Sequence, residues 1–354
     1  MTARTKTRLM RYLTGGLLIL TLLLVACSKT LPQDTLSPLG PEAKKEASLF
    51  WIVFWIAAAV FVLVEGLLVV AMIRFRHRPG RGVPTQVHGN RRLEMTWTII
   101  PALILAGIAV PTVGTIFTLA ARPTGNVLEI EVTGHQWWWE VHYPKDRVIT
   151  ANEIHIPINR PVDVSITSVD VIHSFWVPQL AGKQDLEPGR TNHVTIEATR
   201  PGTYLGQCAE YCGASHANMR FRVIAESPAD FATWVQAEHA PARAPEPGSP
   251  EAQGEDLFTN GRFSGIMANG QPAPVQSCTA CHTVDPSLGG TVGPNLAHFA
   301  SRTTFAGAIY DRTNANLRRW VDDATAMKPG SDMPNFDLTS EQIGALVAYL
   351  ESLQ

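Results

Sequence analysis

The chain lacks an excess of charge of either sign. It contains 29 Lys and Arg against 31 Asp and Glu, for a net charge of −2 over 354 residues. Binding to nucleic acid generally requires a basic surface, so this balance argues against a nucleic-acid partner. The sequence also has no internal repeat. Charge and repetition therefore say little about function, and the placement of cysteine and apolar residues says more.

Cysteine is scarce, but it is grouped. Four of the five cysteines form two close pairs, Cys208 with Cys212 and Cys278 with Cys281, and the fifth is Cys27. A structural disulfide is the simplest interpretation of a close pair in an exported protein. The residues that flank both pairs, however, favour metal and haem binding.

Long apolar runs are concentrated in the first 120 residues. The first run, residues 13–26, follows a basic segment and is short for a membrane span, which predicts an export signal over residues 1–26. It ends in Leu24-Val-Ala-Cys27, a pattern typical of bacterial lipoprotein cleavage sites, so we expect a lipid on Cys27. A plain signal peptide with an incidental cysteine is the alternative.

Two further apolar runs predict a transmembrane hairpin over residues 49–120. They cover residues 49–73 and 95–119, and each exceeds the roughly 20 residues needed to cross a bilayer. Arginines crowd the connection between them, and the positive-inside rule places that loop in the cytoplasm. Residues 27–48 and the chain after about residue 121 then lie on the extracytoplasmic side of a bacterial cell membrane.

The exported part divides into two domains and a linker. From residue 127 to residue 223, short alternating runs are separated by Pro and Gly, which predicts an all-β, cupredoxin-like sandwich within residues 121–239. Residues 240–250 are rich in Pro and Ala and predict a linker with a reach of about 20 to 35 Å. The pattern then becomes helical, so residues 251–354 predict a small all-α domain.

The first cysteine pair lies in a short loop of metal-binding residues. The potential ligands are Cys208, Cys212, His216, Met219 and the carbonyl of Glu210. Two thiolates four residues apart could bridge a pair of ions, and the mixture of thiolate, imidazole and thioether favours copper. A second imidazole is still required. The best candidate is His173, at the end of a predicted strand that a sandwich would bring beside the loop.

The second cysteine pair belongs to Cys278-Thr-Ala-Cys281-His282, the attachment signature of c-type haem. The two cysteines would bind the porphyrin covalently, and His282 would be the fifth iron ligand. A chain that carries copper and haem, with no nucleophile or general base beside either, is expected to move electrons.

The sixth iron ligand must come from downstream. Met333 is the best candidate because Lys328-Pro-Gly-Ser-Asp-Met333 resembles the methionine loop of class I cytochromes c. Met327 and, less favourably, Met267 are the alternatives. In the same fold the carbonyl of Pro294 would accept a hydrogen bond from the histidine ligand, which fixes the orientation of the ring.

These motifs together resemble subunit II of haem-copper cytochrome c oxidases, whose binuclear copper centre is called CuA. The matching blocks are Gly134-His-Gln-Trp-Trp-Trp139, Val171-Ile-His-Ser-Phe-Trp-Val-Pro178, Pro188-Gly-Arg190 and Gly206-Gln-Cys-Ala-Glu-Tyr-Cys-Gly213. A further block spans residues 88–101, and the resemblance covers about residues 45–240. With the haem domain, the chain resembles the caa3-type form, in which a cytochrome c domain is fused to the C-terminus.

The resemblance implies roles for individual residues. The implied copper ligands are His173, Cys208, Glu210, Cys212, His216 and Met219. The Glu210 side chain would also help to hold a magnesium ion at the interface with subunit I. Trp137 would be the residue through which electrons enter, although packing in the sandwich is the alternative. Glu94 would lie at the mouth of a proton channel, or would simply be a solvated residue favoured by the helix dipole.

We therefore expect a subunit of a proton-pumping cytochrome c oxidase that passes electrons from haem c to CuA and on to subunit I, where oxygen is reduced to water. The expected partners are subunit I, the other oxidase subunits, the lipid membrane, and cytochrome c or a respiratory complex as electron donor. A free copper-delivery protein is the alternative from another class. Nitrous oxide reductase would need a catalytic domain that is absent here, and quinol oxidase subunit II lacks the copper ligands.

Overall fold

The computed structural model describes residues 14–16, 33–76, 80, 82, 86, 88–290 and 292–354. Most of the predicted signal segment, and Cys27 with it, lies outside the described residues.

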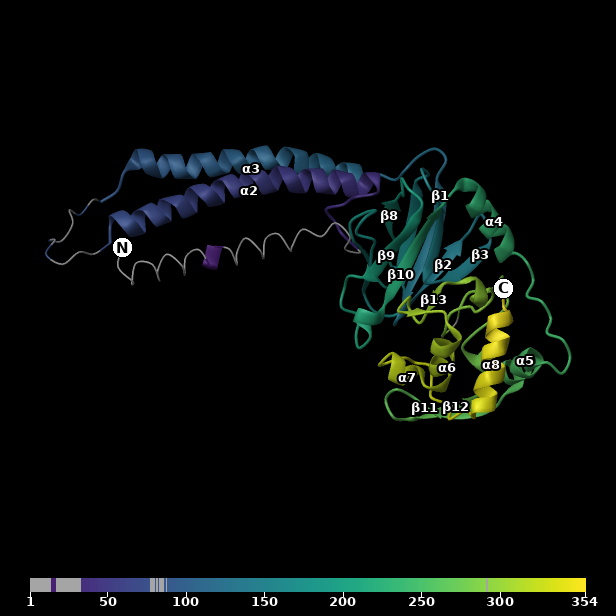
Figure 1. The fold of residues 1–354 in the computed structure, drawn as a ribbon. Helices are drawn as coiled ribbons and strands as arrows, with labels where there is room; N and C mark the ends of the chain where they lie inside the picture. The colour runs from purple at the N-terminus through teal and green to yellow at the C-terminus, as the bar shows by residue number, and fades with distance from the viewer. Residues whose placement is uncertain are drawn as a thin grey trace.

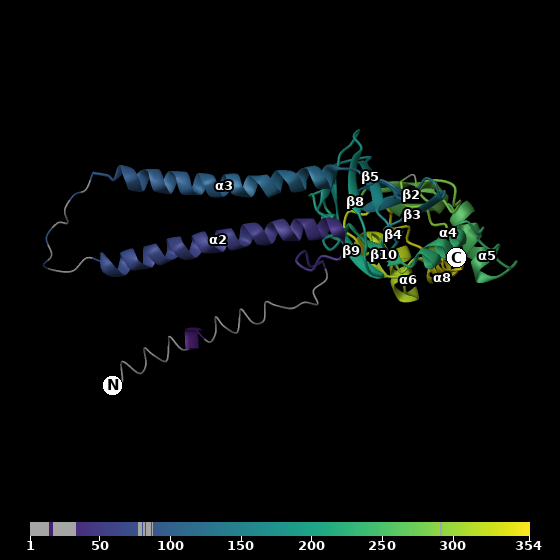
Figure 2. The ribbon, with the colours of Figure 1, turned by 90° about the horizontal axis from the view of Figure 1, so that it is seen from above.

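Two long helices run side by side away from the sandwich (Figures 1 and 2). They are α2, Pro41–Arg74, and α3, Arg91–Ala120, and both are long and apolar enough to cross a membrane. Helix α3 begins at a cap in which Asn90 Oδ1 accepts hydrogen bonds from the backbone N–H of Arg92 and Leu93. The start of α2 lies ahead of the predicted span, and Ala43 and Ala47 are buried there. The base of the hairpin is thus fixed to the sandwich.

Ten strands form two five-stranded sheets packed face to face. The first sheet has the order β3-β2-β1-β5-β8 and comprises β1 Leu128–His135, β2 Trp138–Tyr143, β3 Val148–Ala151, β5 Val162–Ser168 and β8 Asn192–Ile196. The second has the order β4-β10-β9-β6-β7 and comprises β4 Glu153–Pro157, β6 His173–Trp176, β7 Gln184–Leu186, β9 Gly202–Cys208 and β10 Arg220–Glu226. Alternate residues are buried between the sheets, where Trp139, Phe175 and Phe221 form an aromatic centre. Helix α4, Pro228–Glu238, follows the last strand.

The C-terminal domain, residues 250–354, is built around two crossed helices. These are α5, Pro250–Asn260, and α8, Ser340–Ser352. A side chain in place of Gly254 would overlap the backbone of α8, so the crossing requires glycine. Phe258 packs against Tyr349 with ring centroids 5.5 Å apart. Thr339 and Gln342 form the predicted capping box at the start of α8.

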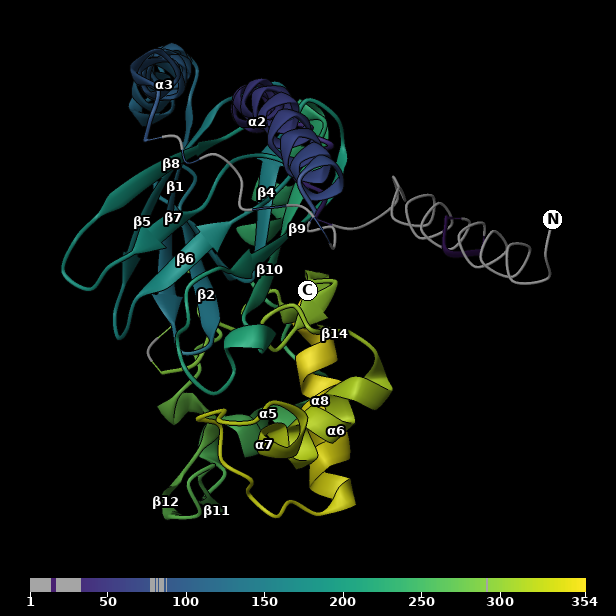
Figure 3. The same ribbon diagram turned by 90° about the vertical axis from the view of Figure 1, so that its left-hand side faces the viewer.

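The C-terminal domain also contains structure that the helical pattern did not indicate. Within the described residues it also has the helices α6 Asn314–Asp322 and α7 Ala324–Met327, the short 3-10 helices η2 Cys278–Ala280 and η3 Phe299–Ser301, and the strands β11 Phe263–Ile266, β12 Pro272–Gln276, β13 Thr304–Phe305 and β14 Tyr310–Asp311. Two short hairpins therefore accompany the helices. The domain lies against an edge of the sandwich, away from the helical hairpin (Figure 3). The predicted combination of membrane hairpin, cupredoxin-like sandwich and cytochrome-like helical domain is confirmed.

Candidate metal and haem sites

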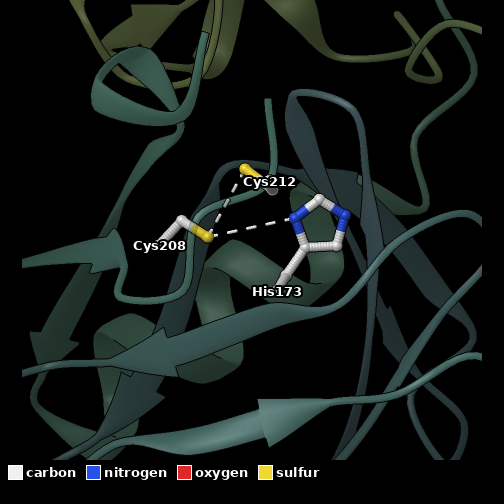
Figure 4. A group of neighbouring side chains, drawn as sticks. All are labelled: His173, Cys208 and Cys212. Carbon is white, nitrogen blue, oxygen red and sulfur yellow. Dashed lines mark hydrogen bonds between the residues drawn. The ribbon is translucent and has the colours of Figure 1, made fainter. Parts of the chain in front are cut away.

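Adjacent strands bring His173 and the first cysteine pair together. His173 is the first residue of β6 and Cys208 the last of β9, and these strands pair with Phe175 opposite Cys208. Cys208 Sγ lies 3.9 Å from His173 Nδ1 and 3.7 Å from Cys212 Sγ (Figure 4). The ligand atoms of these three residues all lie within 4.8 Å of one another.

The other three predicted ligands surround the same sulfur atoms. Cys212 Sγ lies 3.6 Å from His216 Nδ1 and 3.8 Å from Met219 Sδ. The carbonyl oxygen of Glu210 lies 3.2 Å from Cys208 Sγ. Met219 is brought back to the cysteines because its carbonyl accepts a hydrogen bond from Cys208 N at the start of the β9–β10 pairing. All six predicted residues thus form one cluster.

This cluster suits a soft metal ion. Cys208, Cys212, Met219 and His173 are all buried, and the sulfur–sulfur distance of 3.7 Å is far too long for a disulfide. The hydrogen bond from Cys212 lowers the pKa of Cys208 to about 3, and sharing that proton raises the pKa of Cys212. The cluster therefore holds a thiolate at neutral pH, which is the form that binds metals. The donor set fits a copper pair.

An aspartate that the sequence did not single out orients His173. Asp170 Oδ1 lies 2.8 Å from His173 Nε2, so Nδ1 is directed toward Cys208. Burial lowers the pKa of His173, but hydrogen bonds to Cys208 and Asp170 outweigh this effect and raise it. A carboxylate on the far nitrogen of a ligand histidine fixes the ring and increases its basicity.

The second cysteine pair lines a large cavity in the C-terminal domain. Cys278, Cys281, His282 and Met333 all line it. The rest of the wall is largely aromatic and apolar and includes Phe258, Phe299, Phe305, Trp320, Leu346 and Leu350. His282 Nδ1 lies 2.9 Å from the Pro294 carbonyl, which leaves Nε2 as the nitrogen available to iron. The cavity thus combines an apolar wall with the two thiols and two axial donors that a haem requires.

A buried arginine gives a further test of the fit. Arg302 lines the cavity and donates to the carbonyls of Asn295 and Ala297, yet its Nε is buried with no hydrogen-bond partner among the residues that the structure describes. Buried donors are normally satisfied. A carboxylate such as a haem propionate would supply the missing acceptor, so the residues present fit the group.

The cavity also distinguishes the three candidate methionines. Met333 lines it, whereas Met327 and Met267 do not. Met327 is buried elsewhere in the domain, and its carbonyl accepts a hydrogen bond from Tyr310. The position of Met333 therefore supports it as the sixth ligand.

Trp137 lies between the two sites. It lines the haem cavity, and its Nε1 donates to the carbonyl of Cys212 at 3.0 Å. Its own carbonyl accepts a hydrogen bond of 2.6 Å from Lys328 Nζ. Lys328 is the first residue of the loop that carries Met333. One side chain thus contacts both the copper loop and the haem cavity.

Two predicted residues lie away from these sites. Glu94 is in the first turn of α3, at the end of the hairpin far from the sandwich (Figure 1). The Glu210 side chain is 44% exposed, and its carboxylate lies 3.5 Å from Lys183 Nζ. Sequence reasoning missed Asp170 and Arg302, since neither belongs to a ligand motif.

Comparison with known families agrees with the observed domains. The chain matches "Cytochrome C oxidase subunit II, transmembrane domain" over residues 28–114 and "Cytochrome C oxidase subunit II, periplasmic domain" over residues 145–226. Residues 252–354 match "Cytochrome c".

Individual relatives extend over nearly the whole chain. The sequence is 35% identical over 342 residues to "Cytochrome c oxidase subunit 2" of Alkalihalophilus pseudofirmus, covering 95% of each chain. It is also 35% identical over 358 residues to the protein of the same name from Bacillus sp. strain PS3, again covering 95% of each. "Quinol oxidase subunit 2" of Bacillus cereus is 32% identical over 225 residues, which are 62% of this chain and 77% of that protein.

Proposed function

Because the chain belongs to the cytochrome c oxidase subunit II family, we propose that it relays electrons from a covalently bound haem c to a CuA centre and on to subunit I, for oxygen reduction coupled to proton pumping. Subunit II is part of a haem-copper oxidase, an oxidoreductase complex, and this chain adds a cytochrome c domain to it. When bound, the haem and the copper pair supply the redox changes. The protein would hold them in two sites whose loops are in direct contact.

The observation that carries this proposal is the position of Trp137. Its ring lines the haem cavity, and its Nε1 bonds to the carbonyl of Cys212, a proposed copper ligand. The loops that hold the two groups also touch directly, because Ser215 Oγ donates to the carbonyl of Pro329. One aromatic side chain and one hydrogen bond thus connect the cavity wall to the copper loop, and they would offer a route for an electron from a bound haem.

The proposed ligands follow from the observed clusters. The copper pair would be held by His173, Cys208, Cys212, His216, Met219 and the carbonyl of Glu210. The haem would be attached to Cys278 and Cys281, with His282 and Met333 as axial ligands and Pro294 bonded to the far nitrogen of the histidine. A methionine ligand raises the potential of a haem, which suits delivery to a high-potential acceptor.

The opposite face of the copper loop supports transfer onward to subunit I. Glu210 and Tyr211 are exposed there, with Tyr211 77% exposed. Lys183, which pairs with Glu210, follows Gly182, and Gly182 packs against Glu46 at the base of α2. This face therefore lies at the membrane end of the sandwich. We propose that subunit I covers it and that Glu210 helps to hold a magnesium ion there.

The remaining proposals concern the membrane and the electron donor. The sandwich and the C-terminal domain would lie outside the cell membrane, with residues 121–239 and 251–354 as separate domains joined by the linker. Cys27 would carry a lipid, and Glu94, at the cytoplasmic end of the hairpin, would lie beside a proton channel of subunit I. Cytochrome c or a respiratory complex would reduce the haem.

Rapid photoreduction of the haem in the purified oxidase tests the relay. We expect the absorption of the reduced haem to appear first and then to decay as the near-infrared absorption of the copper pair is lost. Trp137→Leu should slow the second phase, while Trp137→Phe, which keeps the ring but loses the bond to Cys212, should slow it less. If the copper stays oxidised after the haem is reduced in a fully metallated complex, the relay is wrong.

A further inference from the structure

A buried carboxylate of the sandwich is inserted into the C-terminal domain. Glu153, at the start of β4, is 2% exposed. Its Oε1 accepts hydrogen bonds from the Thr303 hydroxyl at 2.6 Å, the Thr304 hydroxyl at 2.6 Å and the Thr304 N–H at 2.8 Å. The Thr303 N–H lies 3.0 Å from Oε2. A buried charge is tolerated only when its hydrogen bonds are made, and here all the donors come from the other domain.

A buried lysine side chain makes the reciprocal connection. Lys328 of the C-terminal domain is 4% exposed and donates to the carbonyl of Trp137 at 2.6 Å and to that of Ala306 at 2.9 Å. Nearby, Glu140 Oε2 accepts from Gly290 N at 2.6 Å. Arg220 N donates to the carbonyl of Gly307 at 3.0 Å, which connects β10 to the same domain. Each domain therefore places a buried polar side chain against hydrogen-bonding groups of the other.

The same contacts cover Trp137. Its carbonyl is bonded to Lys328, and two ring atoms, Cζ3 and Cη2, would lie 3.0 Å from a Cβ at Gly330. Gly213 of the copper loop is also close to the ring, because a Cβ there would lie 3.1 Å from Cζ2. The indole is partly buried and in contact with both the copper loop and the methionine loop.

We propose that the C-terminal domain is a permanently seated partner of the sandwich, held by Glu153 and Lys328, and that it closes Trp137 to soluble electron donors. Interfaces between exchanging redox proteins depend on exposed charges and weaken with salt. Glu153 and Lys328 are buried and bonded to neutral groups, whereas the ion pair that crosses the interface, Arg222 with Asp311, has an exposed carboxylate and contributes little, so salt should not release the domain. The linker then keeps the two domains on one chain, but the interface alone keeps them in contact. The role of this contact in closing Trp137 rests on the proposed function, whereas the contact itself does not.

Cleavage of the linker tests the seating directly. Residues 241–244 are exposed, so a protease site can be inserted there in the full-length oxidase. After cleavage and gel filtration at low and at high salt, we expect the c-type haem absorption of the C-terminal domain to elute with the near-infrared copper absorption of the sandwich in both cases. If the two absorptions elute separately at either salt concentration, in a protein with a wild-type interface, the proposal is overturned.

Two variants assign the seating to named groups. In the cleaved protein, Glu153→Ala should weaken the affinity of the C-terminal domain for the sandwich (its retention) about tenfold or more, as expected when at least one charge-assisted hydrogen bond is lost. Glu129→Ala is the matched control, because Glu129 is an exposed carboxylate of the same sandwich paired with Lys145. If Glu153→Ala loses its copper spectrum through misfolding, the double change Thr303→Ala and Thr304→Ala removes the two hydroxyl bonds to Glu153 from the other domain and keeps the backbone N–H bonds. It should weaken retention, and retention equal to wild type in that variant would show that the hydroxyl bonds to Glu153 do not hold the domain.

A second measurement concerns the soluble donor. When uncleaved oxidase is mixed with reduced soluble cytochrome c, we expect the bound haem to be reduced before the copper. Copper reduction that precedes haem reduction would show that Trp137 is open. Failure of the relay is distinguishable from failure of the seating. If the C-terminal domain stays bound after cleavage but its haem cannot reduce the copper, the relay is wrong. If the domain is released after cleavage but reduces the copper in the uncleaved protein, the seating is wrong.

Discussion

A single methyl group added at Gly330 should push the methionine loop away from Trp137 and the copper loop. Gly330 has φ of +85°, a conformation that disfavours any side chain, and a Cβ there would lie 3.0 Å from the Trp137 ring and 3.0 Å from Ala214 Cβ. Gly330→Ala should therefore cost about 1 to 2 kcal/mol for the backbone conformation and a further 1 to 3 kcal/mol, roughly, for overpacking between the domains. Part of this cost is relieved if the domains move apart.

Gly270→Ala is the matched control for this change. Gly270 has φ of +79°, but nothing lies within 4 Å of a Cβ at that position. It should therefore pay the conformational cost alone. We expect both variants to lower the denaturant midpoint of the C-terminal domain, and Gly330→Ala alone to slow haem-to-copper transfer after photoreduction. Equal transfer rates in the two variants, with an unchanged methionine-ligated haem spectrum, would refute the proposed contact between the loops.

Other changes separate the two sites and test the interface. Cys208→Ser should abolish the near-infrared copper absorption and leave the covalent haem spectrum intact; loss of both signals would indicate misfolding instead. Met333→Ala should lower the haem potential and alter its ligation in a redox titration, whereas Met327→Ala should do neither, and the reverse result would exchange the two assignments. Burial lowers the pKa of Lys328 to about 7 from 10.5. Between these pH values the undocked domain binds more protons than the docked domain. Retention of the cleaved domain should therefore strengthen as pH rises from 7 to 9, by at most about tenfold per pH unit. Lys328→Met should lose this dependence, and the same pH response in both proteins would contradict the role of the amine.

The proposed metal ligands could be predicted from the sequence because their chemistry is local. Cys208, Cys212, His216 and Met219 lie in one loop, and the spacing of soft donors alone indicates a copper site. His173 required one more step, the expectation that a sandwich brings strand ends together, and the pairing of β6 with β9 does this. The membrane hairpin followed in the same way from uninterrupted apolar runs.

The hairpin of β11 and β12 could not be predicted by the same reasoning. Its segment is rich in Gly, Pro and Asn and shows neither a helical nor a clear alternating period. What stabilises it is tertiary: Ile266 and Asn335 exchange backbone hydrogen bonds of 2.8 and 3.0 Å, and Phe263 packs against Phe336. A side chain at Gly265 would meet the Asn335 carbonyl at 2.6 Å. The hairpin is thus fixed against the chain that follows Met333, far away in sequence.

The interface between the domains was hidden for a different reason. In an alternating strand a glutamate normally marks a solvated face, so Glu153 gives no signal of burial. Its side chain is buried only because Thr303 and Thr304, 150 residues later, supply every donor it needs. Lys328 is equally uninformative alone, since it belongs to the methionine loop and its acceptor, Trp137, belongs to the sandwich. Each side chain makes hydrogen bonds to the other domain, so its burial cannot be understood from the domain that carries it alone, and the contact depends on how the two folds fit together.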